Sequence, residues 1–171
     1  MLMGPAGCGK STIGRALAAH LEWPFVDGDA LHPPENVAAM RAGIALTDSE
    51  RRPWIAAVAR QIAAWAGVAG GGVIACSALK RSYRQLLAQA GARTVFVLPR
   101  VPRDILVKRV ATRPGHYMPA SLVASQLATF ESPADDEGVI CVDGTLPLAD
   151  TVASIVDTLT LRFDIARGRV A

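Results

Sequence analysis

Residues 4–11 read Gly-Pro-Ala-Gly-Cys-Gly-Lys-Ser and match the pattern G-x-x-x-x-G-K-[ST] at every fixed position. This pattern is typical of a phosphate-binding loop, in which glycines let backbone N–H groups surround the oxygens of a polyphosphate. A helix that begins directly after the loop adds the positive end of its dipole. In such a loop Lys10 reaches the β- and γ-phosphates of a nucleoside triphosphate, and the Ser11 hydroxyl binds Mg²⁺.

The alternative for this segment is a glycine-rich turn before an ordinary helix. A match at all fixed positions argues against it, because a chance match is rare in a chain of this composition. Ile13, Leu17 and Leu21 also recur at helical spacing, so the required helix is present. The residues predicted to bind the nucleotide phosphates and Mg²⁺ are Gly4, Gly7, Cys8, Gly9, Lys10, Ser11 and Thr12.

Asp27-Gly28-Asp29 supplies two carboxylates at the end of the second expected strand. Transfer of a γ-phosphoryl group requires a side chain that accepts the proton of the attacking hydroxyl, and Asp29 is predicted to do this. Asp27 is predicted to face the water shell of Mg²⁺. Asp-Gly is also a common turn pair, so an acidic turn without a catalytic role is the alternative.

Arg109 and Arg113 lie four residues apart on one expected helix, directly before a loop. This layout is typical of a lid, here over residues 109–118, whose arginines close over the phosphates and stabilise the charge of the transition state. Both arginines are therefore predicted to be catalytic, together with Lys10 and Asp29. A solvated helix face is the alternative.

The chain of 171 residues fits one domain, residues 1–171, with a hydrophobic core. A net charge of +3 and a pI near 9.0 suit an anionic substrate, and no basic run with interleaved aromatic residues predicts a nucleic-acid surface. Three widely spaced cysteines argue for a reducing compartment. No signal peptide is recognised, and glycines interrupt the uncharged stretch 61–79, so no membrane span is expected.

Helix and strand signals alternate along the sequence. Apolar runs predict strands at residues 25–27, 72–76, 94–98 and 139–142. Only Met1–Met3 precede the phosphate loop, so the strand that normally leads into such a loop is either very short or begins upstream. One helix is expected to begin at Thr47 or at Pro53 and to end near Trp65. The other helices are expected at residues 10–21, 34–40, 80–90, 102–113, 119–130 and 148–162.

Apolar strands that alternate with helices predict an α/β fold, in which helices cover both faces of a parallel sheet. With the short first strand counted, the sheet is expected to have five strands. Residues 163–171 are expected to form a frayed tail. Ligands bind at the carboxyl ends of the strands in such sheets. The segments expected at this ligand-binding edge are the phosphate loop, 27–29, 76–80, Arg100 and 143–144.

Several separate segments resemble, in the same order, the gluconokinases of the small phosphate-loop kinase type, which are related in architecture to shikimate and adenylate kinases. The segment from Asp27 to Trp54 is the most diagnostic, because shikimate and adenylate kinases do not share it. The matching residues are 4–12, 27–33, Asn36, Met40, 43–48, 51–54, 75–80, Tyr83, Arg84, 115–119, Ser125, Gln126, Thr129 and Glu131.

The resemblance implies a P-loop nucleoside-kinase-like fold and transfer of the γ-phosphoryl group of ATP to the 6-hydroxyl of D-gluconate, which gives 6-phospho-D-gluconate. It also implies ATP and Mg²⁺ as cofactors, a homodimer and a cytoplasmic location. Asp29 would be the base, and the gluconate pocket would comprise Asp29, His32, Arg51, Lys80, Arg84 and His116. A small hydroxy-acid needs a cationic anchor for its carboxylate, and the candidates are Arg51, Lys80 and Arg84.

The departures from the family pattern leave its phosphate and acid–base groups intact. Cys8 stands where serine is more frequent, Tyr117 stands where phenylalanine is common, Pro114 stiffens the lid, and Ser132 separates Glu131 from Pro133. Two alternatives to gluconate phosphorylation stay open. Another small-molecule kinase of this fold, for shikimate or a different sugar acid, would need a different carboxylate clamp. A module that binds ATP without turnover would need neither Asp29 nor a lid.

Overall fold

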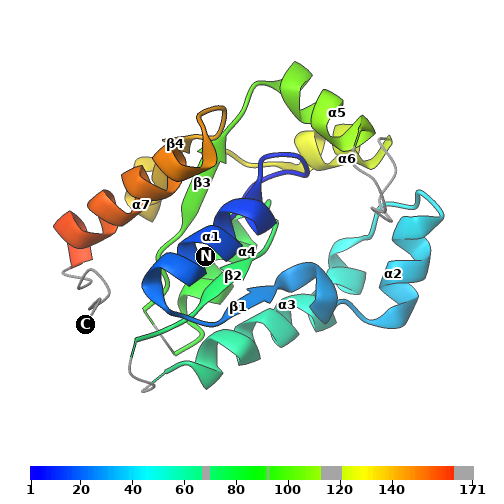
Figure 1. The fold of residues 1–171 in the computed structure, drawn as a ribbon. Coiled ribbons are helices and arrows are strands. Elements are labelled where there is room, and N and C mark those ends of the chain that lie inside the picture. Colours follow the sequence, from blue (N-terminus) through cyan, green and yellow to red (C-terminus); the bar gives the residue numbers. More distant parts are fainter. Residues whose placement is uncertain (67–69, 92, 113–120, 164–171) are drawn as a thin grey trace.

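The computed structural model describes residues 1–66, 70–91, 93–112 and 121–163, which form an α/β fold (Figure 1). Most of the predicted lid and the tail after residue 163 lie outside these ranges. Arg113 and His116, both predicted to belong to the site, therefore lie outside the described residues. No helix in the described ranges is long and apolar enough to cross a membrane.

The strands form two parallel pairs. β1 (Phe25–Asp27) pairs with β2 (Val73–Ala75), and β3 (Val97–Arg100) pairs with β4 (Ile140–Asp143). Leu2 connects the two pairs by single parallel bridges to Ala75 and Val97.

Strand pairing in the described residues does not confirm the expected sheet of five strands. Pairing of the first segment is limited to a few residues: the Leu2 N–H donates to Ile74 O at 2.8 Å and the Met3 N–H to Val97 O at 2.8 Å. The chain then turns into the phosphate loop at Gly4, whose φ is 121°. The described part of the chain contains four short strands and one bridging residue, Leu2.

Seven α-helices are found in the described residues, and two apolar clusters divide most of them between the faces of the sheet. One cluster joins α1 (Lys10–Leu21) and α7 (Leu148–Phe163) around Leu2, and the other joins α3 (Asp48–Ala64) and α4 (Arg81–Ala88) around Met3. Neighbouring residues thus point to opposite faces, as alternation along extended backbone requires. The remaining helices are α2 (Pro34–Arg41), α5 (Arg103–Ala111), α6 (Ser121–Thr129) and the 3₁₀ turns η1 (Gly28–Leu31) and η2 (Asp135–Glu137).

The structure decides between the two possible starts of α3, at Thr47 and at Pro53. Thr47 caps the helix: its N–H donates to Glu50 Oε2 at 2.7 Å, and the Glu50 N–H donates to Thr47 Oγ1 at 3.4 Å. This reciprocal pair is a capping box, which satisfies two backbone groups at the helix end. Pro53 lies inside the helix, so a start at Pro53 is wrong. The capping box places the following turn, with Arg51 and Trp54, against the rest of the site.

Candidate active site

The phosphate loop has the backbone that its glycines predicted. Gly4, Gly7 and Gly9 have φ values of 121°, 84° and 94°. Residues other than glycine rarely adopt such positive φ values. At Gly7 a Cβ atom would also lie 2.8 Å from the carbonyl oxygen of Leu106. The loop ends at Lys10, the first residue of α1, so the N-terminus of this helix faces the space that the loop surrounds.

A pocket of about 300 Å³ lies against the loop. The Lys10 ammonium donates to Pro5 O at 3.0 Å, so the cation is held over the loop. Two of the predicted phosphate ligands, Gly4 and Cys8, do not line this pocket. Cys8 is 1% exposed, and its Sγ lies 3.8 Å from Met3 O. The pocket is lined by Ala6, Gly7, Gly9, Lys10, Ser11, Thr12, Ile13, Asp29, Ser77, Arg109, Gln126, Gly144, Leu146, Leu148 and Thr151.

The two carboxylates of the Asp27-Gly28-Asp29 segment are separated. Asp29 lines the pocket beside the phosphate loop, whereas Asp27 does not. Asp27 Oδ1 accepts the Asp29 N–H at 3.2 Å and thereby caps η1, and Asp27 Oδ2 lies 3.9 Å from the Arg15 guanidinium. Gly28 permits the turn, because a Cβ atom there would lie 2.5 Å from Ala75 O. The segment is thus a turn held against β2 that presents Asp29, while a metal role for Asp27 stays a prediction.

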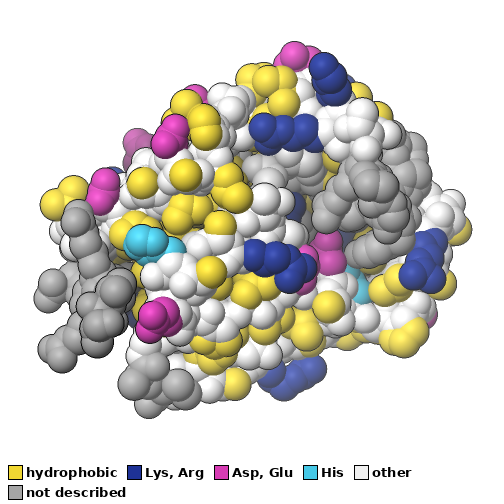
Figure 2. Space-filling view, viewed as in Figure 1, with side chains coloured by type: hydrophobic (Ala, Val, Ile, Leu, Met, Phe, Trp, Pro, Cys, Tyr) yellow, Lys and Arg dark blue, Asp and Glu magenta, His cyan; other side chains and the backbone are white. Residues whose placement is uncertain are grey.

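A second, smaller pocket of about 40 Å³ lies beside the first. Asp29, Ser77 and Gln126 line both pockets, so the two spaces adjoin at these side chains. In the space-filling view, acidic and basic side chains meet beside a hollow near the centre of this face, in the region between α1, α2 and α5 (Figure 2). The smaller pocket is lined by Asp29, His32, Met40, Ala45, Leu46, Arg51, Trp54, Ser77, Leu79, Ser125 and Gln126.

His32 is held in the smaller pocket by stacking. Its ring lies 4.2 Å from that of Trp54, centroid to centroid, with 11° between the ring planes. The Trp54 indole N–H donates to Gly28 O at 2.7 Å, which ties α3 to η1. Burial, and secondly the nearby Arg51 guanidinium, lower the pKa of His32 from 6.5 to about 4. The imidazole is therefore neutral at neutral pH and can exchange hydrogen bonds with a polar ligand.

The lowered pKa of His32 predicts a pH dependence of stability. Because the unfolded chain binds a proton at this residue below about pH 6.5 and the folded chain only below about pH 4, stability is lost as the pH falls through this window. We expect the free energy of unfolding to fall less steeply between pH 6.5 and 4 in His32→Gln than in wild type. His20→Gln, on an exposed residue of α1, is the control in urea titrations at each pH. Identical profiles for wild type and His32→Gln would contradict the prediction.

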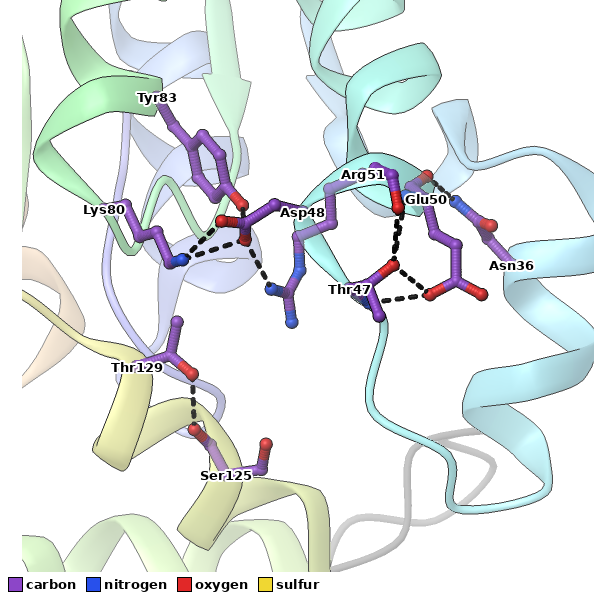
Figure 3. Close-up of polar contacts among 10 residues, drawn as sticks. Asn36, Thr47, Asp48, Glu50, Arg51, Lys80, Tyr83, Ser125 and Thr129 are labelled. Atoms are coloured by element: carbon purple, nitrogen blue, oxygen red, sulfur yellow. Dashed lines mark hydrogen bonds and ion pairs between the residues drawn. The ribbon is translucent and has the colours of Figure 1, made fainter.

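Asp48 contacts two basic residues near the starts of α3 and α4, Arg51 and Lys80 (Figure 3). Lys80 donates to both carboxylate oxygens at 2.9 and 2.6 Å, and the Tyr83 hydroxyl donates to Asp48 Oδ1 at 2.5 Å. Arg51 lies 3.7 Å from the same carboxylate, and its side chain is 16% exposed. Hydrogen bonds from Lys80 and Tyr83 lower the pKa of Asp48, and the bond to Asp48 raises the pKa of Lys80. Of the three candidate anchors, Arg51 alone lines the smaller pocket.

Arg84 is not brought to either pocket. Its side chain is 1% exposed and pairs with Glu137, with Nε–Oε2 at 2.6 Å and Nη2–Oε1 at 2.9 Å. Its Nη1 donates to the backbone carbonyls of Ala78, Leu79 and Glu131 at 3.1–3.2 Å. These bonds occupy the guanidinium and join the β2–α4 connection to the segment after α6. The expectation that Arg84 lines the gluconate pocket is therefore corrected to a structural role.

Breaking the Arg84–Glu137 pair is expected to destabilise the fold. Glu137→Gln removes the charge that compensates a buried guanidinium, and we expect the free energy of unfolding to fall by about 3 kcal/mol. Urea denaturation measures this, with Arg81→Gln as the control, because the Arg81–Asp136 pair is exposed and should contribute below about 1 kcal/mol. The KM for the acceptor should stay unchanged in the folded Glu137→Gln enzyme. A raised KM without loss of stability would return Arg84 to the substrate site.

Arg109 lines the phosphate pocket, and its catalytic role in a lid stays a prediction. Its Nη1 donates to Gly144 O at 3.1 Å and to Gly7 O at 3.4 Å, so it joins α5, the phosphate loop and the segment after β4. Three polar residues that line the pocket had no role assigned from the sequence: Ser77, Gln126 and Thr151. Ser77 follows β2 at the predicted rim, and Gln126 lies in a segment that matched the family pattern. The sequence pointed to the segments that contain Ser77 and Gln126. It did not show that both residues line two adjoining pockets, because this depends on long-range contacts.

Comparison with known proteins agrees with this site. The sequence model of the shikimate kinase family matches residues 6–133. A gluconokinase from Gluconobacter oxydans (strain 621H) is 46% identical over 144 residues, which cover 84% of this chain and 81% of that protein. The residues matched by the family model include Gly7 to Thr12 of the phosphate loop, Asp29 and the residues of the smaller pocket.

Solved structures give the same answer. An unliganded sugar kinase from Janibacter sp. HTCC2649 has a TM-score of 0.87 and 38% identity, over 96% of this chain and 95% of that one. A gluconokinase from Sinorhizobium meliloti 1021 has a TM-score of 0.78 and 39% identity, over 95% of both chains. The similarity in sequence and fold thus spans the parts of the chain that build both pockets. The chain is a kinase that belongs to the gluconokinase family and matches the shikimate kinase family model.

Proposed function

We propose that this enzyme transfers the γ-phosphoryl group of ATP to the 6-hydroxyl of D-gluconate. The observation that carries the proposal is the position of Asp29, which lines both the phosphate-loop pocket and the smaller pocket. A carboxylate at the junction of a nucleotide site and an acceptor site can take the proton of the attacking hydroxyl. The gluconokinases and the sugar kinase that the chain resembles support the choice of acceptor.

In this reaction the phosphate loop binds and orients the nucleotide. Its N–H groups and the start of α1 hold the phosphates, and Lys10 stabilises the charge that develops between the β- and γ-phosphates. Asp29 accepts the proton as the acceptor oxygen approaches in line. The protein thus supplies position and charge rather than covalent chemistry.

The residues at the phosphate pocket fit Mg²⁺. The Ser11 hydroxyl and the Asp29 carboxylate line it, and both are oxygen ligands of the kind that Mg²⁺ prefers alongside phosphates and water. Within the described ranges no cluster of three or more His, Cys, Asp or Glu side chains is placed to hold a metal ion. When bound, Mg²⁺ neutralises charge on the phosphates; Ser11 would hold it, with Asp27 acting through water.

We assign the acceptor carboxylate to Arg51. Lys80 is already neutralised by Asp48, and Arg84 by Glu137, whereas the Arg51 guanidinium lines the smaller pocket and its contact to Asp48 is longer, at 3.7 Å. A guanidinium can hold a carboxylate through two parallel hydrogen bonds. His32, neutral and stacked on Trp54, is then available to a sugar hydroxyl. Lys80 would act through Asp48 rather than on the substrate.

We place the nucleoside against Arg109, Leu146 and Leu148, which line the larger pocket. They combine a guanidinium with apolar side chains on which a base can stack. Arg109 would therefore bind ATP in addition to its predicted role at the transition state. That role, and the lid roles of Arg113 and His116, remain proposals. We also propose a cytoplasmic homodimer, on the resemblance to gluconokinases alone; light scattering of the purified protein tests the dimer.

A substrate panel tests the proposed function. ADP release is measured with gluconate, shikimate, glycerate and no acceptor, in the presence of ATP and Mg²⁺. We expect turnover with gluconate and little with the others, and formation of 6-phosphogluconate in equal amount to ADP. Turnover with shikimate in preference to gluconate would favour the other activity named by the family model. ATP binding without turnover of any acceptor would leave a binding module.

A further inference from the structure

In the described part of the chain, three residues line both pockets: Asp29, Ser77 and Gln126. They lie where the two pockets adjoin, a place that we call the passage. Under the function proposed above, the phosphoryl group is transferred across it. Asp29 and Ser77 follow β1 and β2, whereas Gln126 comes from α6, far away in sequence. Asp29 already has a chemical role in the proposed reaction, and Gln126 has none assigned.

Gln126 is bonded directly to the phosphate loop. Its Oε1 accepts the Ala6 N–H at 2.8 Å, over 120 positions of sequence. Ala6 is 8% exposed, so this backbone donor needs a partner inside the protein. The same glutamine side chain also forms part of the wall of the smaller pocket. One side chain thereby connects the position of the loop with the position of the acceptor.

We propose that Gln126 is a positioning residue for phosphoryl transfer. It holds the phosphate loop at Ala6 against the smaller pocket and fills the passage, so that the acceptor hydroxyl and not water meets the γ-phosphorus. A neutral amide suits this place. A carboxylate would repel the phosphates, and an apolar side chain would leave the Ala6 N–H without its acceptor.

The proposal predicts how transfer and hydrolysis compete. In transfer, the acceptor oxygen bonds to the γ-phosphorus while the bond to ADP breaks, and the hydroxyl proton passes to Asp29. In hydrolysis, a water oxygen makes that bond, and the products are ADP and inorganic phosphate. A passage without Gln126 aligns the acceptor less well and admits water. The ratio of ADP to phosphorylated acceptor therefore reports on the passage.

Gln126→Met tests this, because it keeps the side-chain length and removes the hydrogen-bond acceptor. With gluconate, we expect kcat to fall by about 10- to 100-fold and the KM for ATP to stay within about threefold. The ratio of ADP to 6-phosphogluconate should rise from about one to about two or more. Gln126→Glu keeps an acceptor oxygen for Ala6, so its ratio should lie nearer to one, although its added charge lowers kcat.

Thr129→Val is the matched control on the same helix, because the Thr129 hydroxyl donates only to Ser125 O, at 2.9 Å, among the contacts found in the described residues. It should keep the wild-type kcat and ratio, and thermal midpoints of all variants are measured alongside. A wild-type kcat and a ratio of one in Gln126→Met would overturn the proposal, as would equal ratios in all variants despite a lower kcat. If wild type phosphorylates shikimate instead of gluconate, the proposed function fails, and the same ratio with shikimate decides the role of Gln126.

Discussion

Replacement of Asp29 by asparagine is expected to lower gluconate phosphorylation by on the order of 10² to 10⁴, while ATP affinity stays within about threefold. Asparagine keeps the shape of the side chain at the junction of the two pockets, but it cannot accept the proton of the attacking hydroxyl. The contacts of the phosphate loop do not depend on this proton, so ATP binding should persist. Calorimetry measures ATP affinity, and product formation measures turnover.

Asp27→Asn is the matched control for Asp29→Asn, because it makes the same change two residues earlier. Asp27 caps η1 and approaches Arg15, and it does not line the phosphate pocket. Its replacement should be milder, and a changed Mg²⁺ dependence would support its predicted role at the water shell of the metal. Equal and mild effects of both substitutions would reduce the Asp27-Gly28-Asp29 segment to a turn.

Lys10→Ala is expected to abolish measurable turnover. Lys10 is the cation at the start of α1, held over the loop by its bond to Pro5 O, and no other lysine lines the larger pocket. Its loss should cost at least roughly 3 kcal/mol of transition-state stabilisation, which is typical of removing a preorganised contact to developing charge. Steady-state kinetics with gluconate and ATP gives this value from the ratio of kcat/KM.

Lys108→Ala controls for the loss of one positive charge, because Lys108 is exposed on α5 and does not line either of the two pockets. It should keep kcat within about twofold, since exposed charges at a distance are screened by salt. If Lys10→Ala kept a kcat near that of wild type, the loop would not be the site of the transferred phosphate.

Local signals in the sequence predicted most of the elements. The glycines and Lys10 predicted the phosphate loop and the start of α1, and the spacing of Thr47 and Glu50 predicted the start of α3. Boundaries that depend on pairing were less accurate. The strand expected at 94–98 lies at Val97–Arg100, because its register follows from parallel pairing with β4.

The site was predictable where the chemistry is local and not where it depends on partners. Asp29 and Arg51 both line the smaller pocket, and their roles there stay predictions. Arg84 has the charge of a carboxylate anchor, but Glu137, 53 positions away, is what makes it structural. No periodicity or spacing in one sequence carries that information. The same holds for Gln126, whose bond to Ala6 spans most of the chain.

The bridge at Leu2 has a consequence for synthesis of the chain on the ribosome. Leu2 and Met3 are fully buried, and their hydrogen-bond partners are Ile74 and Val97. Leu2 and Met3 are synthesised before both of these partners, so they stay uncovered until the two later segments have left the ribosome. β1 and β2 can pair earlier. The residues that lead into the phosphate loop are not held in place until β3 has emerged, because Met3 pairs with Val97 over a long stretch of sequence. The nascent enzyme should therefore acquire ATP binding late, after the partners of Leu2 and Met3 have been synthesised.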